Sequence, residues 1–210
     1  MLAPVARPGH VKGVIADTAN HIEAITHDVV DGLGIYNWVA PQPLGSAALD
    51  AFCGALIIKG VCEAIVDAVI DQTVMNVDRF PAAFTWLPSG QSWRAFAYYS
   101  QMIVSNRYAL YDYGKANKQI YGQDEAPLVP IENYNIPTAM MSGDLDQMAV
   151  PIDVEWITQT LGDKVVFSKQ YHLNHGAFCI ANDMSFFSVD AINLLSQYNP
   201  VSTQPELFLN

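Results

Sequence analysis

The fold is decided by residues 136–146, which read IPTAMMSGDLD. This stretch begins as a short apolar run and ends in Ser142-Gly143, a pattern typical of a buried parallel strand. Pro151 follows at a position where the first turn of a helix tolerates proline, and apolar residues recur after it at three- and four-residue steps as far as Leu161. The stretch therefore predicts a strand followed by a helix.

The same order repeats toward the C-terminus. Residues 165–167 predict a second buried strand, residues 171–176 a polar loop, and residues 183–197 a second helix. Strand, helix, strand and helix joined by short connections are the signature of an α/β fold with a parallel sheet. The sequence thus places this chain in the α/β class.

Polar side chains follow both predicted strands, at the edge where α/β sheets bind ligands. Asp144 and Asp146 come after the first strand, and His172 and His175 come after the second. Asp146 and His175 are 29 positions apart, which leaves room for one helix and one strand. An acid and then a histidine is the order in which the last two members of a hydrolase triad occur, where the carboxylate orients the imidazole.

Other interpretations of these residues stay open at this point. Aspartate is a common turn former after strands, so Asp146 and His175 could be loop residues of a general α/β binding domain. Asp144 is a rival for the acid, two residues away. His172 and His175 could bind a metal, but no third ligand accompanies them, and we predict neither metal nor cofactor.

The sequence offers no nucleophile for such a triad. No serine lies in a Gly-x-Ser-x-Gly motif, and the glycines at 9 and 13 flank Val11, which has no nucleophilic atom. Ser92 is best interpreted as the cap of a helix over 92–105. Cys179 is interpreted as a small buried hydrophobic residue.

Composition excludes several classes of protein. Hydrophobic residues make up 51% and charged residues 15% of the 210 positions, which excludes a disordered chain. The formal net charge of −11 argues against nucleic acid and anionic membranes as partners. No apolar run is long enough to span a membrane, the first eight residues do not resemble a signal peptide, and three cysteines do not form a disulfide scaffold.

Six segments in a fixed order carry a family resemblance. They are residues 2–6, 93–114, 134–139, 142–154 and 174–175, together with the nine-residue spacing of Cys53 and Cys62. Within 93–114, an aromatic-Ser-Gln at 99–101 precedes Tyr-Asp-Tyr-Gly at 111–114. These segments resemble the acid lipases of the gastric and lysosomal type, which include cholesteryl ester hydrolases.

The resemblance implies an α/β-hydrolase fold in which Asp146 is the triad acid and His175 the triad base. It implies four regions: the end of a core strand (1–9), a mostly helical cap (10–126), a C-terminal core (127–198) and a tail (199–210). It also implies neutral lipid esters as substrates, a secreted or lysosomal location and a disulfide between Cys53 and Cys62. Such a bridge requires a break in the apolar helix predicted over 49–69, for which Gly54 and Gly60 are candidates.

The chain departs from the family pattern at its N-terminus. Its first residues resemble the stretch that follows the family's nucleophile strand and helix, so we expect an α/β-hydrolase fold truncated at the N-terminus. The nucleophile serine would then lie outside this chain, in an N-terminal half that is missing here, and the chain alone would be inactive. The alternative is a non-catalytic lipid-binding or interaction module derived from a lipase.

Overall fold

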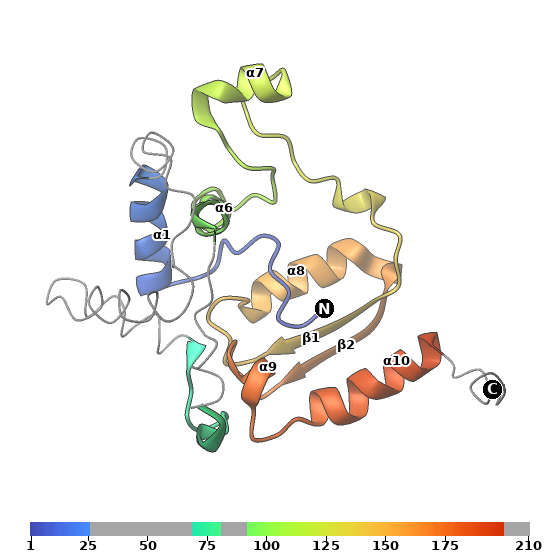
Figure 1. The fold of residues 1–210 in the computed structure, drawn as a ribbon. Coiled ribbons are helices and arrows are strands. Elements are labelled where there is room, and N and C mark those ends of the chain that lie inside the picture. Colours follow the sequence, from blue (N-terminus) through green and yellow to red (C-terminus); the bar gives the residue numbers. More distant parts are fainter. Residues whose placement is uncertain (26–68, 81–91, 200–210) are drawn as a thin grey trace, which may run out of the picture.

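A computed structural model describes residues 1–25, 69–80 and 92–199 of the chain. Its sheet consists of two parallel strands, β1 (Thr138–Gly143) and β2 (Val165–Tyr171), whose register places Gly143 opposite Tyr171. On the other edge of β1, Leu2 forms a parallel bridge with Met141, and the Ala3 amide donates to the Met141 carbonyl. β1 therefore has hydrogen-bonded neighbours on both sides, as Figure 1 shows.

Helices cover both faces of this sheet (Figure 1). Helix α8 (Pro151–Leu161) packs on one face, where Met140 joins Ile157 and Leu161. The other face is covered by α9 (Ala177–Ile180), the π-helical segment η6 (Phe186–Ala191) and α10 (Ile192–Tyr198). Because successive strand residues point to opposite faces, the adjacent Met140 and Met141 fill two separate cores.

A second group of helices lies beside the sheet (Figure 1). Helix α1 (Val14–Ile25) packs against α6 (Trp93–Ser105), with Ala19 and Ile103 buried between them. Short helices complete the described chain: η2 (Val77–Arg79), η3 (Gly114–Ala116), α7 (Asn117–Tyr121), η4 (Ile131–Asn133) and η5 (Gly162–Lys164). The segment that carries α7 extends away from the sheet.

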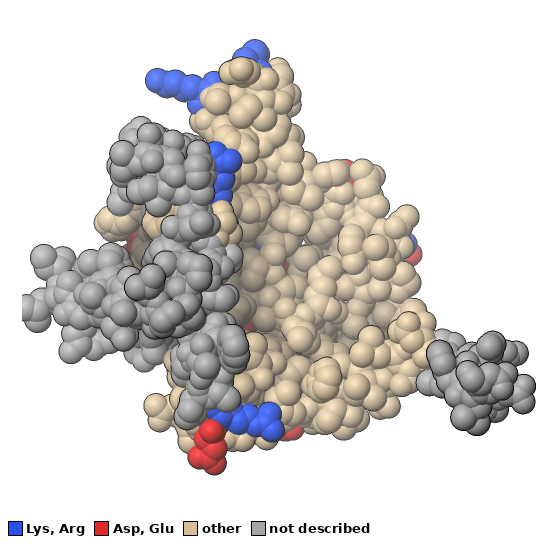
Figure 2. All heavy atoms as spheres, viewed as in Figure 1, with Lys and Arg blue, Asp and Glu red and all other residues tan. Residues whose placement is uncertain are grey.

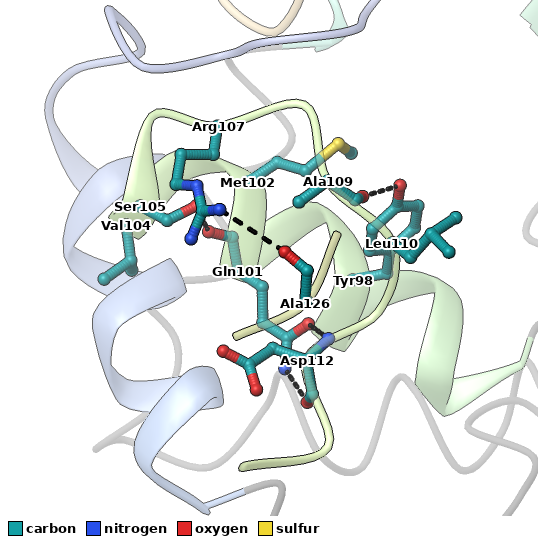
Figure 3. Close-up of a pocket in the computed structure, with 10 residues that line it drawn as sticks. All are labelled: Tyr98, Gln101, Met102, Val104, Ser105, Arg107, Ala109, Leu110, Asp112 and Ala126. Atoms are coloured by element: carbon teal, nitrogen blue, oxygen red, sulfur yellow. Dashed lines mark hydrogen bonds between the residues drawn. The ribbon is translucent and has the colours of Figure 1, made fainter. Parts of the chain in front are cut away.

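Two motifs that carried the family resemblance, at residues 99–101 and 111–114, contact each other. The Gln101 side chain donates to the Asp112 carbonyl at 2.8 Å and accepts from the Asp112 amide at 2.9 Å (Figure 3). The Asp112 carboxylate in turn accepts from the Gly114 amide and from the Asn117 side chain, both at 2.7 Å. Gln101 thus pairs with a backbone segment as a neighbouring strand would, which ties residues 111–117 to α6.

Most of the elements predicted over 92–198 are present. The helices predicted over 92–105 and from Pro151 to Leu161 are confirmed, and residues 183–197 are helical from Phe186 onward. Both strands are present, and β1 begins after Pro137. The predicted helix over 49–69, Cys53 and Cys62 fall almost wholly outside the described residues, so their disulfide stays a prediction, as does the division into cap, core and tail.

Two burial predictions are wrong. β2 was predicted to be buried, yet its residues are half-buried or exposed and Val166 is 47% exposed. The reason is that β2 pairs with β1 on one edge only, within the part of the chain that the structure describes. Cys179 was predicted to be buried and is exposed, because Ala177 and Phe178 take the inward positions of the four-residue α9.

Gly143 allows the chain after β1 to pass close to the loop after β2. A Cβ at Gly143 would lie 2.0 Å from the Leu173 carbonyl oxygen, which is a backbone atom and cannot rotate away. We expect Gly143→Ala to lower the free energy of unfolding by about 1–3 kcal/mol, as overpacking does. Urea denaturation measures this change.

Gly9→Ala is the matched control. Its Cβ would meet Oδ1 and Cγ of the exposed Asn106 side chain at 1.9 and 2.2 Å, which rotation of that side chain relieves, and Cβ of Asn106 at 2.7 Å, which requires a small shift of Asn106 itself. We expect a smaller loss of stability for Gly9→Ala than for Gly143→Ala. Equal losses in the two variants would contradict the importance of the backbone approach at Gly143.

Candidate active site

The carboxyl ends of the two strands bring the predicted polar loops together. The Asp144 amide donates to the Tyr171 carbonyl at 3.0 Å, and the Leu145 amide donates to the Leu173 carbonyl at 3.2 Å. These bonds continue the pairing of β1 with β2 beyond the end of β1. As a result, the loop that carries Asp146 runs beside the loop that carries His175.

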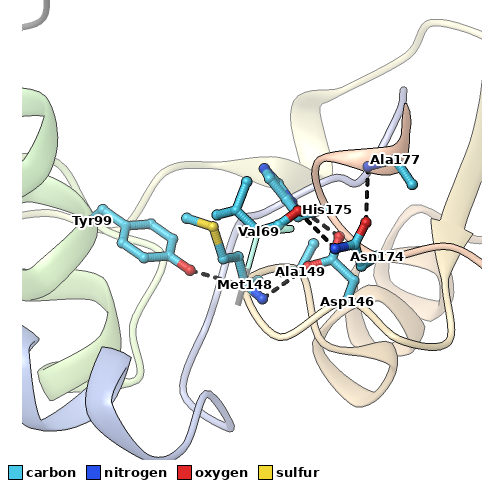
Figure 4. A network of polar contacts seen from close by, with 8 residues as sticks. All are labelled: Val69, Tyr99, Asp146, Met148, Ala149, Asn174, His175 and Ala177. Atoms are coloured by element: carbon cyan, nitrogen blue, oxygen red, sulfur yellow. Dashed lines mark hydrogen bonds and ion pairs between the residues drawn. The ribbon is translucent and has the colours of Figure 1, made fainter. Parts of the chain in front are cut away.

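Asp146 is a buried carboxylate with three hydrogen-bond donors (Figure 4). Its side chain is fully buried. Its Oδ1 atom accepts from the backbone amides of Met148 and Ala149, each at 2.8 Å. Its Oδ2 atom lies 2.9 Å from Nδ1 of His175. The two amides belong to the turn that leads into α8, so the carboxylate is held by its own turn and by one side chain from the other loop.

His175 presents its ring at the surface of the site. Its side chain is 32% exposed, whereas its carboxylate partner is fully buried. An ionised carboxylate only accepts hydrogen bonds, so contact with Asp146 places the ring proton on Nδ1. In the neutral ring, Nε2 then carries the free lone pair, which is the arrangement that a general base requires.

The backbone beside His175 is fixed by a segment distant in sequence. Asn174 is buried, and its side chain donates to the Val69 carbonyl at 2.7 Å and accepts from the Ala177 amide at 2.9 Å. The Gly176 amide also donates to the Val69 carbonyl, at 3.2 Å. A Cβ at Gly176 would lie 2.4 Å from that oxygen, so the approach requires glycine.

Two further histidine–aspartate contacts exist in the described chain. Nδ1 of His172 lies 3.0 Å from Asp144, and both side chains are largely exposed. Asp144, the rival acid, therefore contacts His172 and not His175. Asp153 is buried and binds His10 twice, through the ring at 2.6 Å and through the backbone amide at 3.1 Å.

The contacts made by Val69 and His10 were not predicted from the sequence. A backbone carbonyl carries no residue signature, so nothing marks Val69 as the acceptor for the loop at 174–176. His10 lies 143 positions from Asp153, and its neighbours form no motif that points to that partner. Asp153 itself was singled out only as part of the segment 142–154.

Two cavities lie in the described part of the chain, one beside the loop after β2 and one beside α6. One of about 250 Å³ adjoins the loop after β2 at Tyr171, His172 and Leu173. The other, of about 80 Å³, lies beside α6 (Figure 3) and is smaller than a typical ligand pocket. Within residues 1–25, 69–80 and 92–199, no three His, Cys, Asp or Glu side chains are placed to hold a metal ion.

Comparison with known proteins identifies relatives of this chain. Over 157 residues it is 27% identical to "Lipase lipl-1" of Caenorhabditis elegans, a match that covers 73% of this chain and 39% of that protein. Over 201 residues it is 24% identical to the "Tear acid lipase-like protein" of Mesocricetus auratus, covering 94% and 50%. The chain is related to the acid lipases. A third relative, "Lysosomal acid lipase/cholesteryl ester hydrolase" of Rattus norvegicus, is 26% identical over 49% of this chain and 27% of that protein.

The chain spans half or less of the length of each of these three proteins. No family model matches it. The relationship implies an α/β-hydrolase fold, with which the helices and the small parallel sheet are consistent. In the part of the chain that the structure describes, no helix has the length and apolar character needed to cross a membrane.

Asn174 is expected to hold the loop of His175. We expect Asn174→Ala to lower the free energy of unfolding by about 1–3 kcal/mol, because the buried Ala177 amide would lose its acceptor. The exposed Asn20, which donates to the Ala16 carbonyl within α1, provides the control. Asn20→Ala should change stability by less than about 0.5 kcal/mol in the same urea denaturation. Equal effects would show that the contacts of Asn174 add nothing to stability.

Proposed function

We propose that Asp146 and His175 are the acid and base of a Ser-His-Asp triad, and that the complete site hydrolyses carboxylic esters of neutral lipids. The observation that carries this proposal is the 2.9 Å contact between a fully buried carboxylate and a partly exposed histidine at the carboxyl ends of two parallel strands. The relationship to acid lipases supports the reaction class.

Each residue has a defined part in this chemistry. Nε2 of His175 takes the proton of the serine hydroxyl as that oxygen attacks the ester carbonyl, and then gives it to the leaving alcohol. The imidazolium formed in between is stabilised by the Asp146 carboxylate, which also keeps the ring in one tautomer. Water then repeats the sequence on the acyl-enzyme and releases the fatty acid.

The proposal places the nucleophile outside this chain. No serine among the 210 residues stands in Gly-x-Ser-x-Gly, the turn that presents such a nucleophile in α/β-hydrolases. The relatives are at least twice as long as the stretches that match. The alternative, a non-catalytic lipid-binding module, finds no favouring feature among the described residues, whereas the Asp146–His175 contact has a direct catalytic use.

The names of the relatives support a proposal for the substrate class and the location. One relative is named a gastric triacylglycerol lipase and another a lysosomal acid lipase/cholesteryl ester hydrolase, so we propose triacylglycerols or sterol esters as substrates and a secreted or lysosomal location. On the face that Figure 2 shows, few charged side chains lie among the residues that are not drawn in grey. No cofactor is required by this chemistry.

The position of the serine can be tested by reading the DNA upstream of the Met1 codon. We expect an in-frame Gly-x-Ser-x-Gly motif about 20–30 residues before Leu2. If the upstream reading frame carries no such motif, the proposed triad lacks its nucleophile and the hydrolase proposal is wrong for this chain.

The roles of the chain's own residues can be tested by activity. We expect the 210-residue chain alone to show no turnover of a short-chain chromogenic ester above background, because no serine in its sequence stands in the Gly-x-Ser-x-Gly motif that presents the nucleophile. The polypeptide extended by the upstream segment should be active. In that polypeptide, His175→Ala should lower kcat by on the order of 10⁴-fold or more.

His172→Ala is the control for this loss. It removes a neighbouring histidine that also contacts an aspartate but lies on the exposed side of the loop. We expect kcat to stay within about threefold of the value for the unmodified polypeptide, since His172 contacts Asp144 and not the buried carboxylate of Asp146. A large loss with His172→Ala and none with His175→Ala would reassign the base.

A further inference from the structure

Tyr99 connects α6 to the turn that holds Asp146. Its ring packs in the cluster formed by Val11, Ala19 and Ile103, with Val150 beside it. Its hydroxyl leaves this cluster and donates to the Met148 carbonyl at 2.9 Å. Figure 4 shows the phenol reaching from α6 toward the loop of Asp146.

The bond from Tyr99 acts on the same peptide group that binds Asp146. The Met148 carbonyl and the Ala149 N–H are the two ends of one planar peptide, and in the trans form they point in opposite directions. The carbonyl accepts from Tyr99, while the N–H donates to Oδ1 of Asp146 at 2.8 Å. A peptide held at both ends has little freedom to rotate, and hydrogen bonds in such a series strengthen one another.

We propose that Tyr99 is a positioning residue for the triad acid: by holding the peptide between Met148 and Ala149, it fixes the Asp146 carboxylate in the orientation that directs Oδ2 at Nδ1 of His175. This inference rests on the proposed function of Asp146 and His175. It assigns α6, which belongs to the predicted cap region, a direct part in the geometry of the site.

The surroundings of Tyr99 keep its hydroxyl a donor. Burial raises the pKa of Tyr99 well above its ordinary value, and the nearby carboxylates of Asp146 and Asp153 raise it further. The phenol therefore remains protonated wherever these carboxylates are ionised and the protein is folded. Its proton has a single acceptor in this network, the Met148 carbonyl (Figure 4).

The neighbouring Tyr98 provides a matched control. It lies on the same helix and also donates its hydroxyl to a backbone carbonyl, that of Ala109. Ala109 lies in the segment after α6 and forms an antiparallel bridge with Leu128. Replacing either tyrosine with phenylalanine keeps the ring and removes one O–H to carbonyl bond, but only Tyr99→Phe acts on the peptide that binds Asp146.

The test is NMR of the full 210-residue chain labelled uniformly with ¹⁵N, recorded in sucrose, which favours the folded state of every variant. In the unmodified chain we expect His175 to carry its proton on Nδ1. In Tyr99→Phe we expect at least a threefold larger Nε2–H tautomer population and at least tenfold faster exchange of the Ala149 amide. Tyr98→Phe should match the unmodified chain in both measurements.

The outcomes separate this inference from the proposed function. If Tyr99→Phe and Tyr98→Phe give the same His175 tautomer and the same Ala149 exchange, Tyr99 has only a packing role and the inference is overturned. Asp146→Asn tests the pair itself and should change the His175 tautomer. An unchanged His175 spectrum in Asp146→Asn would overturn the proposed triad, whereas a change there without one in Tyr99→Phe would overturn the role of Tyr99 alone.

Discussion

The site depends on the burial of one carboxylate. Removing the Asp146 charge from water costs several kcal/mol, and only well-oriented donors offset that cost. Two of its donors are amides of its own turn, and the third is the ring of His175 from the neighbouring loop. The first two bonds are local and would form in any similar turn, so the third is the one that requires the fold.

The fold supplies that third bond through backbone contacts. The parallel register of β1 and β2 sets the two loops side by side, and Gly143 lets the backbone after β1 approach the Leu173 carbonyl. Gly176 does the same for the Val69 carbonyl on the other side of the His175 loop. Because backbone atoms cannot move aside as side chains do, these approaches leave the loops few alternative positions.

The sequence predicts the parts of the site that have a local signature. The apolar run before Ser142 and the spacing within 151–161 identified β1 and α8, and loop placement then singled out Asp146 and His175. It did not predict the exposure of β2, because an apolar run such as that at 165–167 does not show on which edge its neighbours lie. It also did not predict Val69, whose contribution is a carbonyl oxygen that every residue type has.

The choice between the two acids depended on burial, which sequence spacing does not carry. Asp144 and Asp146 are two positions apart, and each contacts one histidine of the same loop. The contact of Asp144 is exposed, so water screens it and the ring gains little orientation from it. The Asp146 carboxylate has no solvent to exchange with, so its charge acts on His175 in a medium of low dielectric.

The third pair shows that burial alone is also not sufficient. Asp153 is buried and contacts His10, but its second oxygen binds the His10 backbone amide. Both of its oxygens are thus directed at one residue, and the pair fastens the N-terminal segment to α8. Asp146 differs because Oδ1, the oxygen that does not contact His175, accepts from two amides of its own turn. The carboxylate is therefore held in place without His175, and it sets the orientation of the His175 ring. A base that moves protons during a reaction needs a partner that stays fixed while the charge of the ring changes, and among these three pairs only Asp146 meets that condition.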